Sequence, residues 1–199
     1  MNKKLAFLFL LGLFCLTPEV YAQTPVNIGS MFANGTSSFE AITKLIQYSS
    51  YLIGTFLIVG SIFKLSQLGS NPQMTAKTPI VMFAVGAGIF ALTGSIAIVS
   101  QTLSMGSGPG NALLPTPAGV DASVGAAVRG ILTFIRMIGY IAFIRGWLML
   151  NSAGQGKDGM IGKGLTHLAG GVACINITIF AKMLAATFAP GIPLSVIGL

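Results

Sequence analysis

Four long apolar segments dominate the pattern of hydrophobic and polar positions along the chain. They lie at Gln47–Leu65, Pro79–Val99, Ile131–Leu150 and Leu165–Phe188. Each is close to the roughly 20 residues that an apolar helix needs to cross a bilayer. Polar, glycine-bearing turns at Ser66–Thr78 and Asn151–Gly164 join the segments in pairs. The pattern predicts an all-α membrane protein with four transmembrane helices, arranged as two tandem hairpins after an N-terminal signal peptide.

The segments outside the apolar runs define the expected domains. Residues 1–22 have the pattern of a signal peptide, because Lys3 and Lys4 precede a short apolar run and Ala22 ends a small-residue cleavage motif. An uncleaved membrane anchor is the alternative. The expected order is then an extracytoplasmic lead at 23–46, a first hairpin at 47–99, an extracytoplasmic Gly/Pro loop at 100–128 and a second hairpin at 129–199.

The two hairpins resemble each other in sequence. A shift of 85 positions pairs Lys44 with Arg129, Gly54 with Gly139 and Gly86 with Gly171, and it needs no gap. Because an even number of membrane crossings separates the two halves, a duplication would leave both hairpins in the same orientation. We therefore predict a duplicated, parallel hairpin; the alternative is chance similarity between two segments of membrane composition.

The distribution of basic residues predicts how the chain is oriented. Lys64 and Lys77 border the first turn, Lys157 and Lys163 lie in the second, and the segment 100–128 contains no Lys or Arg. Basic residues favour the cytoplasmic side of a membrane. We therefore expect a multi-pass protein of a bacterial inner membrane, with both turns in the cytoplasm and the mature N- and C-termini in the periplasm.

Composition supports a membrane protein and removes one class of function. Only 8% of the residues are charged and 53% are hydrophobic, whereas soluble domains carry about 25% charged residues. The formal net charge is +7, but the basic residues are scattered rather than gathered in a run that could grip phosphate. We therefore expect no direct nucleic-acid binding.

Cations inside the apolar segments, or just before one in the case of Arg129, are the main candidate site. Arg129 and Arg136 are seven residues apart and share a helical face, whereas Arg145 points nearly the opposite way. Lys182 is a fourth cation, and no Asp or Glu lies inside the four apolar segments. Charges within a membrane are costly, so we expect these residues to contact partner proteins or membrane lipid. Snorkelling of the side chains to the headgroups is the alternative.

Small residues at four-residue spacing are candidate helix-packing positions. Such stripes allow close approach of helix backbones within a membrane. The two stripes are Ala87, Ala91 and Ser95, and Ala181, Ala185 and Ala189.

The sequence offers no apparatus for catalysis or cofactor binding. His167 has no Cys, Asp or Glu at ligand spacing, so a metal site is not expected. Gly106–Gly110 lacks the Lys-Ser/Thr pair that follows the glycines of a phosphate-binding loop. No nucleophile motif and no pair of intramembrane carboxylates is present. We therefore expect no cofactor and no enzymatic activity.

Two segments carry a resemblance to a known family. They are YLIGTFLIVGSIFKLSQLGSN at Tyr51–Asn71 and RMIGYIAFIRGWLMLNSAGQG at Arg136–Gly156. Together with the hairpin pattern, they resemble the IcmC/DotE family of type IVB secretion system inner-membrane proteins, from the Dot/Icm system and its IncI-type conjugation relatives. The resemblance implies a structural subunit of an apparatus that exports protein or DNA, with other secretion-system membrane subunits as its partners.

Two further interpretations stay open. Each hairpin also looks like a type IV pilin, with two helices and a basic cytoplasmic turn, so a pilin-like subunit that self-associates is one variant of the same function. A small stand-alone channel or transporter is the alternative function, in which the repeat and the cations line an anion path. The expected continuity of the four spans counts against it, because transporter sites are typically built from helices broken near the membrane midplane.

Overall fold

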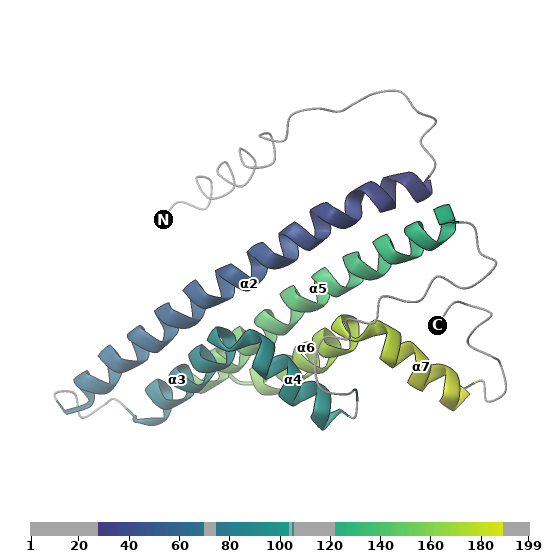
Figure 1. The fold of residues 1–199 in the computed structure, drawn as a ribbon. Coiled ribbons are helices and arrows are strands. Elements are labelled where there is room, and N and C mark those ends of the chain that lie inside the picture. Colours follow the sequence, from purple (N-terminus) through teal and green to yellow (C-terminus); the bar gives the residue numbers. More distant parts are fainter. Residues whose placement is uncertain (1–27, 70–74, 104, 106–121, 189–199) are drawn as a thin grey trace.

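The computed structural model describes residues 28–69, 75–103, 105 and 122–188, and its regular elements are all helical (Figure 1). The elements are α2 (Ile28–Ser66), the short 3-10 helix η1 (Gln67–Gly69), α3 (Lys77–Phe90), α4 (Leu92–Thr102), α5 (Ala122–Gly154), α6 (Met160–Ile175) and α7 (Ile177–Phe188). The predicted all-α fold is confirmed. The signal peptide expected at 1–22 and the Gly106–Gly110 run lie outside the described residues.

Two of the helices are long and apolar enough to cross a membrane as single rods. The qualifying stretches are Asn34–Ser66 of α2 and Val124–Gly154 of α5. The predicted second and fourth spans are each bent, because α3 meets α4 at 96° and α6 meets α7 at 94°. The number of candidate spans is therefore two, or four when each bent pair is counted as one span. This membrane protein consists of two tandem hairpins, each with one straight and one bent arm.

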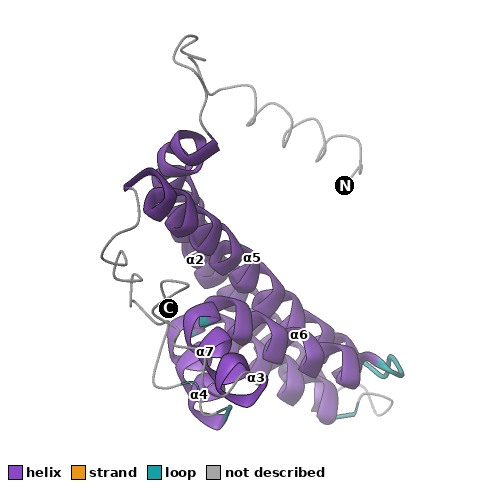
Figure 2. Cartoon of the chain, turned by 90° about the vertical axis from the view of Figure 1, so that its right-hand side faces the viewer, coloured by secondary structure: helices purple, strands orange, loops and turns teal. Residues whose placement is uncertain are grey.

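The two straight arms, α2 and α5, pack against each other along the length of the molecule. Helices α2 and α5 lie side by side and run in the same direction (Figures 1 and 2). Helix α3 packs against α2, and α6 packs against α5, which completes the two hairpins. Contacts of α3 with α5 and of α4 with α6 then join one hairpin to the other.

Glycines bring the arms of each hairpin into contact at equivalent positions. A Cβ atom at Gly54 would lie 2.6 Å from the backbone nitrogen of Phe90, and one at Gly139 would lie 2.8 Å from the carbonyl oxygen of Gly171. The second pair of glycines repeats the pattern. A Cβ at Gly86 would lie 3.0 Å from the nitrogen of Ile58, and one at Gly171 would lie 2.8 Å from the nitrogen of Phe143. Because Ile58 and Phe143 are also 85 positions apart, the same helix crossing occurs twice.

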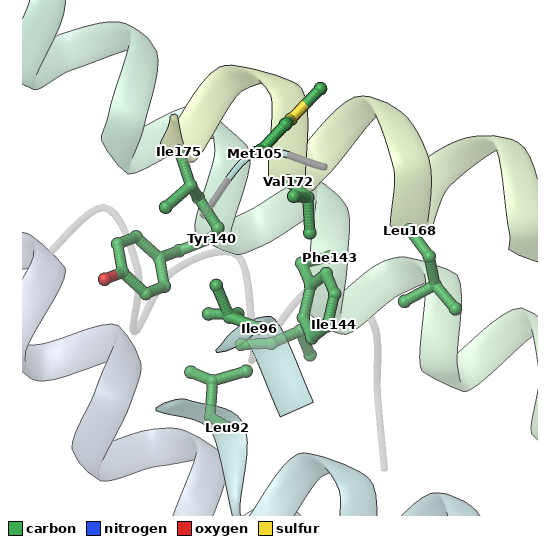
Figure 3. Packing of buried hydrophobic residues seen from close by; sticks show 9 residues of the cluster. All are labelled: Leu92, Ile96, Met105, Tyr140, Phe143, Ile144, Leu168, Val172 and Ile175. Carbon is green, nitrogen blue, oxygen red and sulfur yellow. The ribbon is translucent and has the colours of Figure 1, made fainter. Parts of the chain in front are cut away.

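The main buried core lies where the two hairpins meet. Phe143 of α5, Leu92 and Ile96 of α4 and Val172 of α6 gather in one cluster, with Tyr140 of α5 at its edge (Figure 3). Phe143, Ile96 and Val172 are fully buried. The second hairpin is therefore packed against the bent end of the first.

Helix α2 begins earlier than the sequence pattern indicates. The predicted extracytoplasmic lead at 23–46 is helical from Ile28 onward, although it contains Gly29, Asn34 and Gly35. A glycine inside a helix costs only about 1 kcal/mol, and tertiary contacts offset such a cost. One of these contacts joins Phe39 to Phe134 of α5, with ring centroids 5.3 Å apart.

Candidate functional site

The bends in the two hairpins have the same backbone construction. At the first bend, the Ala91 N–H donates to the Ala87 carbonyl at 2.9 Å, and the Ala91 carbonyl accepts from the Ser95 N–H at 2.9 Å. At the second bend, Asn176 makes the equivalent bonds to Val172 and from Phe180, both at 2.9 Å. Ala91 and Asn176 are 85 residues apart. Each bend therefore keeps its central backbone groups bonded, which a helix break in a membrane requires.

Side-chain hydrogen bonds complete the first bend. The Ser95 hydroxyl is buried and lies 2.6 Å from the Gly88 carbonyl oxygen and 3.1 Å from that of Ala91. The Gly88 carbonyl belongs to the last turn of α3, where helical carbonyls have lost their usual partners. Ser95 therefore binds the end of α3 from the first turn of α4.

The second bend is tied to the first hairpin by a buried polar pair. The side-chain nitrogen of Asn176 donates to the Ser100 hydroxyl oxygen at 2.9 Å and to the Val172 carbonyl at 3.2 Å. Both Asn176 and Ser100 are fully buried. A buried amide without partners would be costly, so this pair fixes how α4 lies against the bend between α6 and α7.

Arg136 completes this junction from α5. Its Nε donates to the carbonyl oxygen of Ile175, the last residue of α6, at 3.2 Å. A cation is favourable at a helix C-terminus, where the helix dipole is negative. One turn further along α5, the Tyr140 side chain is hydrogen-bonded to Gln47 of α2. We call Gln47, Ser100, Arg136, Tyr140 and Asn176 the polar junction.

Arg136 also has a partner inside the chain. The absence of acidic residues from the spans indicated that the intramembrane cations would find their partners outside the chain. Arg136 makes one such contact within the chain, to the backbone carbonyl of Ile175, and its expected contact with partners or lipid stays a prediction. The sequence could not reveal this partner, because α6 ends at a bend that its apolar pattern does not mark.

The other three cations are not part of the junction. Arg145 of α5 and Lys182 of α7 are exposed, and Arg129 near the start of α5 is half-buried. Their expected contacts with partners or lipid stay predictions. Within the described residues, no group of three or more His, Cys, Asp and Glu side chains could hold a metal ion.

The bend interrupts the first predicted small-residue stripe, whereas the second stripe stays a prediction. Because α3 ends at Phe90, the 96° bend separates Ala87 from Ser95, with Ala91 exposed between them. In the second stripe Ala181 is half-buried on α7, whereas the Ala185 side chain and Ala189 lie outside the described part. Glycines provide the close helix contacts instead. The internal repeat pairs Gly54 with Gly139 and Gly86 with Gly171. That pairing was the feature of the sequence that marked these contact positions.

A groove opens between α3, α5 and α6 near the two turns. It has a volume of about 320 Å³ and is lined mainly by apolar side chains, among them Val81, Trp147, Leu150 and Ile161. Lys77, the first residue of α3, also lines it. An apolar groove beside a cation suits a lipid chain below an anionic headgroup.

The fold and its junction define a helical membrane protein built from two bent hairpins. Comparisons with protein-family models, curated proteins and solved structures found no significant match to this chain.

The internal contact of Arg136 gives a first prediction. Arg136→Ala should destabilise the fold by about 1 kcal/mol, a typical value for one intramembrane hydrogen bond, and lower the midpoint of thermal unfolding in detergent by about 3 °C. The exposed Arg145 is the matched control on the same helix, and Arg145→Ala should shift the midpoint far less. Equal shifts for the two variants would contradict the assigned role of Arg136.

Proposed function

We propose that this chain is a non-enzymatic structural subunit of a type IVB secretion or conjugation apparatus in a bacterial inner membrane. The observation that carries the proposal is the use of the polar groups at the junction. Asn176 and Ser100 bond each other at full burial, and Arg136 binds a helix-terminal carbonyl. These groups fix the arrangement of the helices, which is what a scaffold subunit requires.

The outward faces of the hairpins supply the contact surface that such a subunit needs. Arg145 is exposed in the middle of an otherwise apolar face of α5, with the exposed Ile141 and Leu148 on either side. A cation at such a position gains most from an acidic group on a neighbouring protein or from a lipid phosphate. The resemblance to the IcmC/DotE family supplies the kind of apparatus, and the lysines beside the two turns favour termini in the periplasm.

A small channel or transporter is the second candidate, and one observation favours it. The two bent arms are helices broken inside apolar segments, which is typical of transporter binding sites. The expected continuity of all four spans, which counted against this function, is therefore wrong. Anion flux into liposomes that contain the purified protein, abolished by Arg136→Ala, would favour a transporter over a scaffold.

Photo-crosslinking in native membranes tests the proposed function. A photoreactive residue at Arg145 should crosslink to other envelope proteins, and these products should vanish when the rest of the apparatus is deleted. The same probe at Ile144, which is buried next to Arg145, is the matched control and should react within the chain. Crosslinks from Arg145 to lipid alone would contradict the proposal.

A further inference from the structure

The internal repeat leaves two helix faces exposed whose equivalents are buried or half-buried inside the chain. On α2, Leu52 is 65% exposed, whereas its repeat equivalent on α5, Met137, is 9% exposed. Thr55 and Val59 are also exposed on this side of α2. Their equivalents Tyr140 and Ile144 belong to the core cluster that packs against the first hairpin. The second hairpin thus buries a face that the first hairpin leaves open.

The opposite mismatch occurs on α5. Phe39, Thr43 and Ile46 of α2 are half-buried; Phe39 contacts Phe134 of α5, and Ile46 packs against the core cluster. Their equivalents on α5 are Val124, Val128 and Ile131, and all three are exposed. The first hairpin thus buries a face that the second hairpin leaves open.

The exposed face of α2 and the exposed face of α5 are the repeat equivalents of two surfaces that pack together inside the chain. Within the chain, Ile46 of α2 and Leu92 and Ile96 of α4, all from the first hairpin, pack in the cluster that holds Tyr140 and Ile144 of the second hairpin. Both hairpins share one helix crossing, one bend position and one direction, so the same packing can be repeated between chains. A contact that joins two different surfaces in this way is head-to-tail, and its repetition gives a ring or a filament.

We infer that a second copy of this chain docks head-to-tail, with its Leu52, Thr55 and Val59 face packed against Val124, Val128 and Ile131 of the first copy. By the same equivalence, Ala181 of α7 takes the place of Ile96 in the new contact, because these residues are 85 positions apart. The inference rests on the repeat and on the exposure pattern. It holds for any assembly in which the chain takes part.

A third helix face, exposed in both hairpins, serves as a control for simple exposure to lipid. Phe56 is 77% exposed and its equivalent Ile141 is 49% exposed, so neither hairpin uses this face for the other. Phe56 directly follows Thr55 and points about 100° away from it around the helix. The two residues therefore lie at nearly the same depth, but only Thr55 belongs to the inferred contact.

Photo-crosslinking at these neighbouring positions tests the inference. Two tagged forms of the full-length chain are co-expressed in membranes, one with a photoreactive residue at position 55 and one without. Crosslinked pairs should be captured through the second tag, and mass spectrometry should place the crosslinks on α5 or α7 of the second copy. The same photoreactive residue placed at position 56 should not give these crosslinked pairs.

Substitutions on the opposite face give an independent readout. Ile131→Trp should abolish the crosslink from position 55, because the indole would fill the space that α2 of the next copy occupies, whereas Ile141→Trp should leave it intact. The inference is overturned if position 55 reacts with lipid alone, with a different protein alone, or with α2 of the second copy. None of these outcomes decides the proposed function, which the crosslinks from Arg145 test separately.

Discussion

Replacing Gly171 by alanine is expected to destabilise the protein, whereas the same replacement at the preceding Gly170 is expected to be neutral or slightly stabilising. A Cβ at Gly171 would lie 2.8 Å from the Phe143 nitrogen and 2.9 Å from the Gly139 carbonyl oxygen. Both are backbone atoms, so α6 has to move away from α5. Overpacking of this kind costs about 1–3 kcal/mol. At Gly170 an added Cβ has no heavy atom within 4 Å, and alanine favours a helix by about 0.5–1 kcal/mol.

The measurement is the midpoint of thermal unfolding in detergent. The readout is the loss of the monodisperse peak in size-exclusion chromatography after heating. Gly171→Ala should lower this midpoint by about 5 °C, from the expected free-energy loss and the size of the chain. Gly86→Ala tests the repeat, because its Cβ would lie 3.0 Å from the Ile58 nitrogen in the first hairpin. Equal midpoints for the alanine variants at 170 and 171 would contradict the described crossing of α5 and α6.

The second large effect is expected at the polar junction. Asn176→Ala removes the donor to the Ser100 hydroxyl and the second bond to the Val172 carbonyl. It also leaves a cavity, because Asn176 is fully buried. Together these losses should destabilise the fold by about 2 kcal/mol. The change should be visible as a lower unfolding midpoint at unchanged protein yield.

A double-mutant cycle with Ser100→Ala isolates the contact between the two hairpins. If the Asn176–Ser100 bond joins them, Asn176→Ala should cost less in the Ser100→Ala background than in the wild type, by about 0.6 kcal/mol or more. Thr166→Ala on α6 is the control, because its exposed hydroxyl donates to the Gly162 carbonyl of its own helix. Strictly additive costs at positions 100 and 176 would show that the bond does not contribute to stability.

The hairpins could be predicted from the sequence, but their bends could not. The apolar pattern located each arm, and the pairing of Gly54 with Gly139 and of Gly86 with Gly171 marked the later contact points. Across Ala91 and Asn176, however, the apolar run continues without a proline. The bends arise where Leu92 and Ile175 pack into the core between the hairpins, and such tertiary packing overrides local helix propensity.

The candidate site was only partly predictable for a related reason. Arg136 stood out as a charge within an apolar run, but its partner is a backbone carbonyl, which no residue type announces. Ser100 was expected to begin the extracytoplasmic loop, whereas it lies fully buried in α4. The role of Asn176 depends on its place at the bend. Residue identity therefore marked one member of the junction, and the fold was needed to bring the others to it.

Both hairpins are expected to cross the membrane in the same direction, with both turns in the cytoplasm. Single cysteines at Ser66 and Gln155, each exposed near one of the two turns, test it directly in a background with Cys15 and Cys174 replaced by serine. A membrane-impermeant maleimide should label both positions in inverted vesicles and neither in spheroplasts. Labelling of the two positions from opposite sides, or of both in spheroplasts, would contradict two parallel hairpins with cytoplasmic turns.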